Sequence, residues 1–288
     1  MEVPKNIFRN YDIRGIYPEQ FNEEIAFHLG RALGTRLVRN EKSRVVVGRD
    51  NRDSSPTLSE ALIEGLVKTG CDVTNIGITL TPIIHFLTCT EGYELGLNVT
   101  ASHNPKEFNG LRIDYKNARS FYGDLVLMLR FLVEREEYVY QEGTYREENL
   151  NKKYIDYMGG KFNFKSNPKV VINCGHGATS ELAPQLLNAL GCQVVALNCR
   201  FDGSFPKGVP DPENEVFTDE VKEYIKNHQV DVGFVFDADG DRFGMVDDKA
   251  ENYATDKALL YFAEDVLARN PGGKVVYDVK SSALVEDY

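Results

Sequence analysis

Three aspartates alternate with small residues in the stretch DADGDR at 237–242, between two apolar runs. Carboxylates this close repel one another unless a cation neutralises them. Hard oxygen ligands with open coordination positions favour Mg²⁺, which usually keeps sites for water and a phosphate oxygen. The stretch therefore predicts a loop between two strands in which Asp237, Asp239 and Asp241 bind a divalent cation.

Three other interpretations of this acidic stretch are weighed against it. An isolated D-x-D is ordinarily a solvated acidic turn, but here the stretch has the strand-loop-strand context that a metal-binding motif needs. A calcium loop of the EF-hand kind fits less well, because Arg242 stands where that loop needs glycine and Asp248 where it needs glutamate. A phosphatase of the haloacid dehalogenase type would use Asp237 as its nucleophile, but it would want threonine or valine in place of Asp241.

A serine in the stretch TASHNPKEFNG at 100–110 is the second candidate. Ser102 follows the apolar run 95–99, a predicted buried strand, and strand ends are where ligands of α/β sheets collect. The ordinary alternatives are a serine turn ahead of Pro105 and a hydrogen-bonded loop histidine at His103. A serine beside a divalent cation with an open position is, however, the arrangement needed if that serine carries a phosphoryl group.

Repeated units supply the elements that must position these side chains. Short β-branched runs alternate with amphipathic segments, which is typical of a parallel sheet covered by helices in the α/β class. The strands that open the units are predicted at 45–47, 170–173 and 274–279, and helices follow the first two at 55–68 and up to Gly191. A period beyond 100 residues indicates repeated domains rather than a solenoid.

The repeats predict two complete domains, at 1–150 and 151–253, and the start of a third at 254–288. The polar stretch QEGTYREENLNKK is read as the exposed connection between the first two, and DKALLYFAEDVLARN as a helix of the third. The predicted strand at 274–279 has only nine residues after it, so it would have an open edge. We expect 255–288 to be the least stable part, exposing apolar surface or associating with a partner through it.

Composition limits the partners. The formal net charge is −11, which argues against nucleic acid or an anionic membrane as the main partner, since both would need a basic surface. The five cysteines are scattered without a C-x-x-C pair, and no apolar run is long enough to cross a bilayer. These features predict a cytoplasmic protein, and a small anionic substrate would need a locally basic pocket.

The motifs resemble those of a known family. TASHNPKEFNG looks like the phosphoserine loop of the α-D-phosphohexomutases and DADGDR like their metal loop. FRNYDIRG at 8–15 resembles the amino-terminal signature of the phosphomannomutase/phosphoglucomutase branch, and VVVGRDNRDSS at 45–55 also matches. The resemblance implies a four-domain enzyme with a central cleft, whose first three domains are similar mixed-sheet α/β units.

In that family, the serine phosphate passes to a hexose monophosphate, the hexose bisphosphate turns around, and its other phosphate returns to the serine. The resemblance therefore implies transfer between the 1- and 6-positions, with mannose and glucose phosphates as the expected substrates and Mg²⁺ as cofactor. Carried over residue by residue, it implies catalytic roles for Ser102, His103, Arg112 and Arg14, phosphate or substrate binding by Arg242, Asn104 and Tyr11, and metal binding by Ser102, Asp237, Asp239 and Asp241.

Two departures from the family pattern matter. Arg112 stands where the family usually has a lysine assigned to proton transfer, and a guanidinium is a poor proton acceptor, so His103 is a substitute candidate. The G-E-x-S-G and R-x-S-G-T motifs of the later domains do not occur in these residues. We therefore expect the 288-residue chain to bind Mg²⁺ and hold phosphate on Ser102 but to turn over hexose phosphate negligibly. A noncatalytic cation-binding fragment is the alternative outside enzymes.

Overall fold

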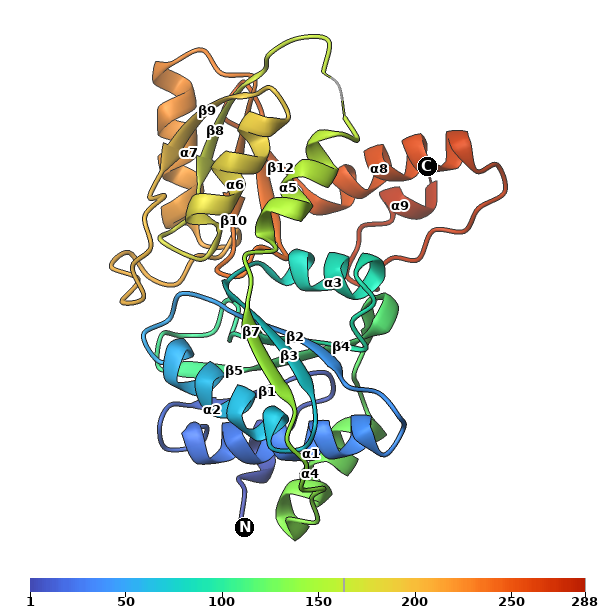
Figure 1. Cartoon of the computed structure of the whole chain (residues 1–288). Coiled ribbons are helices and arrows are strands. Elements are labelled where there is room, and N and C mark those ends of the chain that lie inside the picture. The colour runs from blue at the N-terminus through green and yellow to red at the C-terminus, as the bar shows by residue number, and fades with distance from the viewer. Residues whose placement is uncertain (163, 288) are drawn as a thin grey trace.

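The computed structural model of this chain describes residues 1–162 and 164–287. It contains two mixed β-sheets, each covered by helices on both faces, and a C-terminal helical segment that projects to one side (Figure 1). The sheet of β1 to β7 with its helices is the first unit, and the sheet of β8 to β12 with its helices is the second unit. This arrangement confirms the predicted α/β class with repeated mixed-sheet units. Within the two described ranges, no helix combines the length and apolarity needed to cross a membrane.

The first sheet has the strand order β1-β5-β4-β2-β3-β7, with β6 paired to β5. Its centre is parallel, whereas β5 runs antiparallel to both β4 and β1. One strand, β7, lies inside the polar connection of the sequence and pairs with β3 at the sheet edge. The strands are β1 (Ile13–Ile16), β2 (Arg44–Arg49), β3 (Asp72–Ile78), β4 (Leu95–Val99), β5 (Phe108–Tyr115), β6 (Arg119–Ser120) and β7 (Thr144–Glu147).

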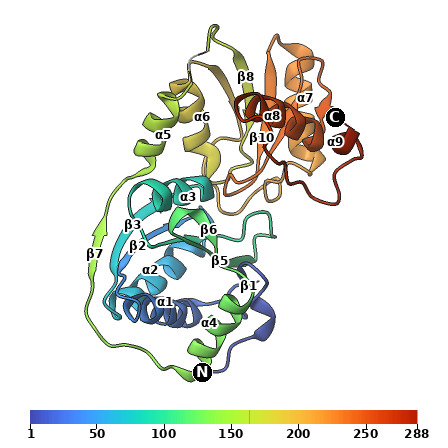
Figure 2. The same ribbon diagram turned by 90° about the vertical axis from the view of Figure 1, so that its right-hand side faces the viewer.

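Helices cover both faces of this sheet, which explains why its central strands are continuously apolar. Val45 and Val47 of β2 point into one core with α1, α2 and α4, while Val46 points into the other core under α3. Figure 2 shows α3 between the first sheet and the second unit. The helices are α1 (Glu23–Val38), α2 (Ser55–Val67), α3 (Thr81–Thr90) and α4 (Asp124–Arg135).

Two glycines let the backbones of α1 and α2 touch. A Cβ atom on Gly65 would lie 2.1 Å from the carbonyl oxygen of Phe27, and one on Gly30 would lie 2.2 Å from the carbonyl oxygen of Leu62. Because the obstructing atoms belong to helix backbone, a side chain at either position forces the helices apart.

Gly65→Ala should therefore destabilise the first unit. Helix propensity alone would stabilise it by up to about 1 kcal/mol, but overpacking typically costs about 1–3 kcal/mol, and here the neighbour is backbone. We expect the urea midpoint to fall. Gly159→Ala is the matched control, because a Cβ there would meet its nearest atom at an ordinary 3.5 Å; that variant should be neutral or slightly stabilised. Equal midpoints for the two variants would contradict the tight helix contact.

The second sheet has the order β12-β11-β10-β8-β9, with β8, β9 and β10 parallel and β11 and β12 antiparallel. Val171 packs with α7, and Val170 and Ile172 pack with α6 on the other face. The elements are α5 (Asn151–Gly159), β8 (Lys169–Asn173), α6 (Thr179–Ala189), β9 (Gln193–Leu197), α7 (Glu215–Asn227), β10 (Val232–Phe236), β11 (Phe243–Val246) and β12 (Asn252–Tyr253).

The predicted strand at 274–279 is wrong: these residues form no strand. Val276 and Val279 are 92% and 96% exposed, and none of the strands in the described ranges pairs with this run. The predicted helix is confirmed as α8 (Thr255–Arg269), and α9 (Leu284–Asp287) follows. Tyr261 and Phe262 of α8 are exposed, which confirms the expected apolar surface. The low stability expected of 255–288 stays a prediction, and residue 288 lies outside the described residues.

Candidate functional site

The acidic loop connects β10 and β11, as its flanking apolar runs predict. Asp237 and Asp239 are buried, whereas the side chain of Asp241 is partly exposed. One oxygen from each of the three carboxylates lies within 4.8 Å of the others. The backbone amide of Arg242 donates to Asp237 Oδ1 at 3.1 Å, which closes the loop and points the carboxylates inward.

The serine loop begins where β4 ends. The backbone amide of Ser102 donates to Thr100 Oγ1 at 2.9 Å, and that of Asn104 donates to the carbonyl oxygen of Ala101 at 3.0 Å. Ser102 has a φ of 49°, in the left-handed region that non-glycine residues rarely adopt. Such a conformation costs on the order of 1–3 kcal/mol and persists only where the surroundings impose it.

The two loops meet although 135 residues separate them. Ser102 Oγ donates to Asp237 Oδ2 at 2.9 Å and lies 3.2 Å from His103 Nδ1. Both loops follow the ends of buried parallel strands, β4 in the first unit and β10 in the second. The structure therefore brings the predicted serine and the predicted cation ligands together at one place.

Without a cation, the ionised forms of these carboxylates are unfavourable. Burial raises the pKa of Asp237 to about 8, with Asp239 and Asp241 adding to the effect and Arg242 and the Ser102 hydroxyl opposing it. Burial also raises the pKa of Asp239, again with a contribution from Asp241. A bound cation would reverse both shifts, because it favours the ionised carboxylates.

The donor set fits a hard divalent cation. Asp239 Oδ1 is buried and has no hydrogen-bond partner among the described residues, while Oδ2 of the same group accepts from Thr81 Oγ1 at 2.7 Å. A buried carboxylate oxygen left without a donor is costly unless something else binds it. With Asp237, Asp241 and Ser102 Oγ close by, the site supplies oxygen ligands only, as Mg²⁺ prefers.

The three predicted arginines all lie beside the loops. Arg242 Nε is 3.2 Å from Asp237 Oδ2, and its Nη2 is buried without a partner among the described residues. Arg14 Nη1 donates to Asn104 Oδ1 at 2.8 Å and to the carbonyl oxygen of Ala101 at 3.1 Å. Arg112 Nη1 is 3.4 Å from Asp241 Oδ2.

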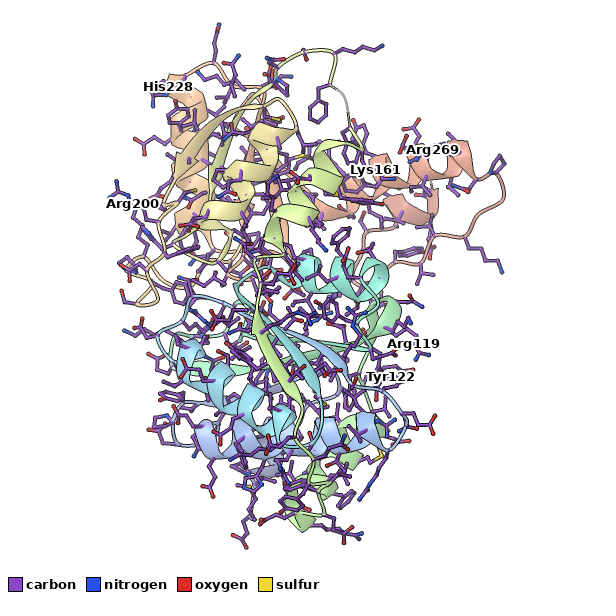
Figure 3. All side chains as sticks on the ribbon, viewed as in Figure 1. Arg119, Tyr122, Lys161, Arg200, His228 and Arg269 are labelled. Carbon is purple, nitrogen blue, oxygen red and sulfur yellow. The ribbon has the colours of Figure 1, made fainter. Side chains whose placement is uncertain are left out.

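This gathering of cations contrasts with the periphery of the molecule. Figure 3 shows Arg119, Arg200 and Arg269 at the outer edge of the molecule. A protein with a formal net charge of −11 thus has a local group of guanidinium groups at the contact of its two units. Each of these guanidinium groups also forms an ion pair with an aspartate, Arg14 with Asp12 at 2.8 Å, Arg112 with Asp241 at 3.4 Å and Arg242 with Asp237 at 3.2 Å, so the group is not an excess of positive charge.

His103 and Tyr11 differ in their placement. Burial lowers the pKa of His103, and the nearby charge of Arg242 lowers it further, so its imidazole is neutral near pH 7. A groove of about 470 Å³ opens beside it, with Lys106 and Asp211 in its lining. Tyr11 is 67% exposed and makes no side-chain hydrogen bond to the two loops, so the structure does not bring this predicted residue into the group.

Sequence reasoning missed two buried polar residues beside the site, of which Thr81 links the two units. Thr81, at the start of α3, bonds to Asp239 through both its hydroxyl and its backbone amide, which donates to the carbonyl oxygen of Asp239 at 3.0 Å. Buried Asn98 Nδ2 in turn donates to Thr81 Oγ1 at 2.9 Å. A polar asparagine inside the apolar run 95–99 was the available signal, because a buried amide needs a partner.

Comparisons with known proteins agree with the fold. The family models described as phosphoglucomutase/phosphomannomutase, alpha/beta/alpha domains I and II, match residues 5–131 and 152–250. Phosphomannomutase/phosphoglucomutase from Pseudomonas putida is 36% identical over 278 residues, which are 96% of this chain and 60% of that protein. Its Pseudomonas aeruginosa counterpart is 34% identical over 290 residues, 99% of this chain and 62% of that one.

A solved structure shares the fold closely. The crystal structure of a phosphoglucomutase/phosphomannomutase family protein from Burkholderia thailandensis superposes with a TM-score of 0.94 at 32% identity, covering 99% of this chain and 65% of that one. The chain thus spans about 60% of the length of the curated Pseudomonas relatives it matches.

Proposed function

Because this chain belongs to the phosphoglucomutase/phosphomannomutase family, we propose that it carries a phosphoryl group on Ser102 as a phosphohexomutase. The observation that carries the proposal is the 2.9 Å contact between Ser102 Oγ and Asp237 Oδ2, which joins the two predicted loops across the two units. The activity moves phosphate between the 1- and 6-positions of a hexose phosphate through a bisphosphorylated intermediate.

The residues at hand can perform the transfer to serine. Ser102 Oγ forms a bond to the phosphorus of a hexose bisphosphate while the bond from phosphorus to the sugar oxygen breaks. The Ser102 hydroxyl, which donates to Asp237 in this structure, turns to neutral His103 Nδ1 at 3.2 Å, which accepts its proton, and the leaving sugar oxygen takes a proton from water. The reverse step gives the phosphoryl group to the other end of the sugar. Arg112 stays protonated, so it balances charge rather than accepting a proton.

Asp237, Asp239, Asp241 and Ser102 Oγ would hold Mg²⁺, which when bound supplies positive charge against the phosphoryl oxygens. The buried Nη2 of Arg242 has no partner among the described residues and can donate to one of those oxygens, and Arg14 bonds to Asn104 of the serine loop. The names of the relatives favour mannose and glucose phosphates as substrates. A cytoplasmic setting, where such phosphates occur, suits the five free cysteines.

The test is the intact mass of the purified chain before and after incubation with glucose 1,6-bisphosphate and Mg²⁺. We expect the mass of one phosphate to be added and fragmentation to place it on Ser102. The haloacid dehalogenase alternative predicts label on Asp237, and the noncatalytic alternative predicts no label. The relatives described above support neither alternative. Label on Asp237 or on neither group would contradict the proposal.

A further inference from the structure

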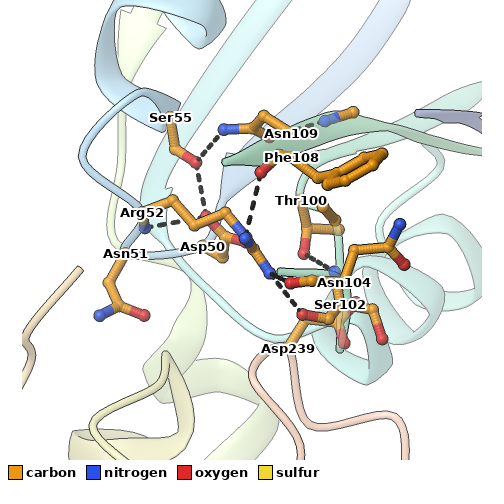
Figure 4. A network of polar contacts seen from close by, with 12 residues as sticks. Asp50, Asn51, Arg52, Ser55, Thr100, Ser102, Asn104, Phe108, Asn109 and Asp239 are labelled. Atoms are coloured by element: carbon orange, nitrogen blue, oxygen red, sulfur yellow. Dashed lines mark hydrogen bonds and ion pairs between the residues drawn. The ribbon is translucent and has the colours of Figure 1, made fainter. Parts of the chain in front are cut away.

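Arg52, which follows β2 in the stretch GRDNRDSS, places its guanidinium against the serine loop (Figure 4). The side chain is 1% exposed, so its charge is removed from water. A guanidinium has five N–H donors, and all five are used here. Nε donates to Asp50 Oδ2 at 3.1 Å, Nη1 donates to the carbonyl oxygens of Pro105 at 2.8 Å and Phe108 at 3.1 Å, and Nη2 donates to those of Ser102 at 2.7 Å and Asn104 at 2.8 Å.

The guanidinium is itself held in place from behind. Asp50 is fully buried, and besides pairing with Arg52 Nε it accepts from the backbone amide of Arg52 at 3.0 Å and from the hydroxyl of Ser55. Asn109 Nδ2, on β5, donates to Ser55 Oγ at 2.9 Å. A planar fork fixed in this way gives its four remaining hydrogens defined directions, unlike a lysine ammonium.

The four remaining N–H groups of Arg52 all donate to the same loop. The accepting carbonyls belong to residues 102–108, and the first of them is Ser102 itself, whose φ of 49° needs an external constraint. A buried ion pair is weak support for stability alone, because apolar side chains of similar volume often serve as well. The convergence of four donors on the strained loop therefore points to control of loop geometry.

We propose that Arg52 is a positioning residue, an inference that rests on the proposed function: its guanidinium holds the serine loop so that Ser102 Oγ faces Asp237 and the transferring phosphorus. Arg52 does not touch Ser102 Oγ or any reacting atom, because its contact with Ser102 is through the carbonyl oxygen. Its removal should leave the nucleophile present but misplaced. A misplacement of about 1 Å lowers a transfer rate by roughly 100-fold.

The chain offers a matched control in Arg31. That side chain is also buried, at 3% exposure, and also donates to backbone carbonyls, those of Lys68 at 2.8 Å and Val139 at 3.2 Å, far along the chain from the serine loop. Arg31→Ala and Arg52→Ala thus remove the same group from comparable surroundings. Only one of them faces the serine loop.

The first measurement is the rate of Ser102 phosphorylation in the 288-residue chain by saturating glucose 1,6-bisphosphate with Mg²⁺, normalised to the folded fraction seen by far-UV circular dichroism. We expect Arg52→Ala to be slower by about 100-fold and Arg31→Ala to stay within about twofold of the wild-type chain. Low millimolar guanidinium should restore part of the rate in Arg52→Ala, whereas urea at equal concentration should not. If Arg52→Ala does not fold, Arg52→Lys, which keeps the charge with at most three donors, takes its place with an intermediate rate expected.

Hydrogen exchange tests the positioning without any phosphoryl transfer. In Arg52→Ala the amides of Ser102, Asn104 and Phe108 should exchange faster than in the wild-type chain, while those of β8 to β10 should not change. If the wild-type chain takes up no phosphate, the proposed function fails and the exchange data still decide the role of Arg52. Equal phosphorylation rates in the wild-type and Arg52→Ala chains, or unchanged exchange in the loop, would overturn the inference.

Discussion

Replacing Ser102 by alanine should reduce uptake of phosphate from glucose 1,6-bisphosphate to below detection while the chain stays folded. Ser102 Oγ is the hydroxyl that contacts both Asp237 and His103, so the variant loses the nucleophile and keeps the acidic loop. Loss of the hydrogen bond to Asp237 should lower the free energy of unfolding by only about 1 kcal/mol. Intact mass and urea unfolding, measured on the same preparation, separate the two effects.

Ser59→Ala is the matched control for this prediction. Ser59 is also a buried serine of the first unit, and its hydroxyl donates to the carbonyl oxygen of Pro56 at 2.9 Å, on α2 and away from the acidic loop. This variant should take up one phosphate as the wild-type chain does. Phosphate that persists in Ser102→Ala, for example on Thr81 beside Asp239, would show that the acceptor is misassigned.

Much of the fold and of the site could be predicted because the signals are local. The acidic loop sits between β10 and β11, and Ser102 follows β4, as the apolar runs around them indicate. A cluster of polar turn residues after an apolar run predicts a loop at a strand end from the neighbouring sequence alone. The meeting of these two loops is not contained in the local pattern, because β4 and β10 belong to different sheets; it was implied by the chemistry of a serine beside a cation and by the family resemblance.

Other features depend on contacts that no local pattern contains. β7 is an edge strand made of exposed polar residues, Thr144–Glu147, and only its pairing with β3 makes it a strand. The run 274–279 has the opposite character: its composition suits a strand, but none of the strands that the structure describes pairs with it. β-Structure is in both cases decided by the partner rather than by the segment.

The buried polar residues around the site could not be predicted either, because their contacts are also distant in the sequence. Arg52 and Thr81 act on groups 50 and 158 residues away, Ser102 and Asp239. Sequence alone shows an arginine in a polar turn and a threonine before a proline, both ordinary at the start of a helix. Their roles become visible only when each buried donor is traced to its acceptor.

Removal of the cation should make the stability of the chain depend on pH in an unusual direction. Burial raises the pKa of Asp237 to about 8 in the folded chain, against about 3.9 when unfolded. Between these values the folded state holds a proton that the unfolded state has lost. The free energy of unfolding in EDTA should therefore fall as pH rises from about 4 to about 8, and level off above.

Mg²⁺ should remove this loss, because it binds the ionised carboxylates in place of the proton. Its stabilising effect should be larger at pH 8.5 than at pH 5.5, and about 2.7 kcal/mol wherever the free ion is at a hundredfold excess over its dissociation constant. Urea unfolding at several pH values, with Mg²⁺ and with EDTA, measures both effects.

Asp239→Asn isolates the contribution of the acidic loop from that of other titrating groups. The amide removes one of the charges that raise the pKa of Asp237, so the variant in EDTA should lose less stability as pH rises than the wild-type chain. It also removes the carboxylate whose Oδ1 has no partner among the described residues, so Mg²⁺ should stabilise it far less. The histidines and cysteines contribute equally to the pH dependence of both chains, so their contribution drops out when the free energies of unfolding are subtracted. If Mg²⁺ stabilises the variant as much as the wild-type chain at pH 8.5, Asp239 is not a ligand and the cation lies elsewhere.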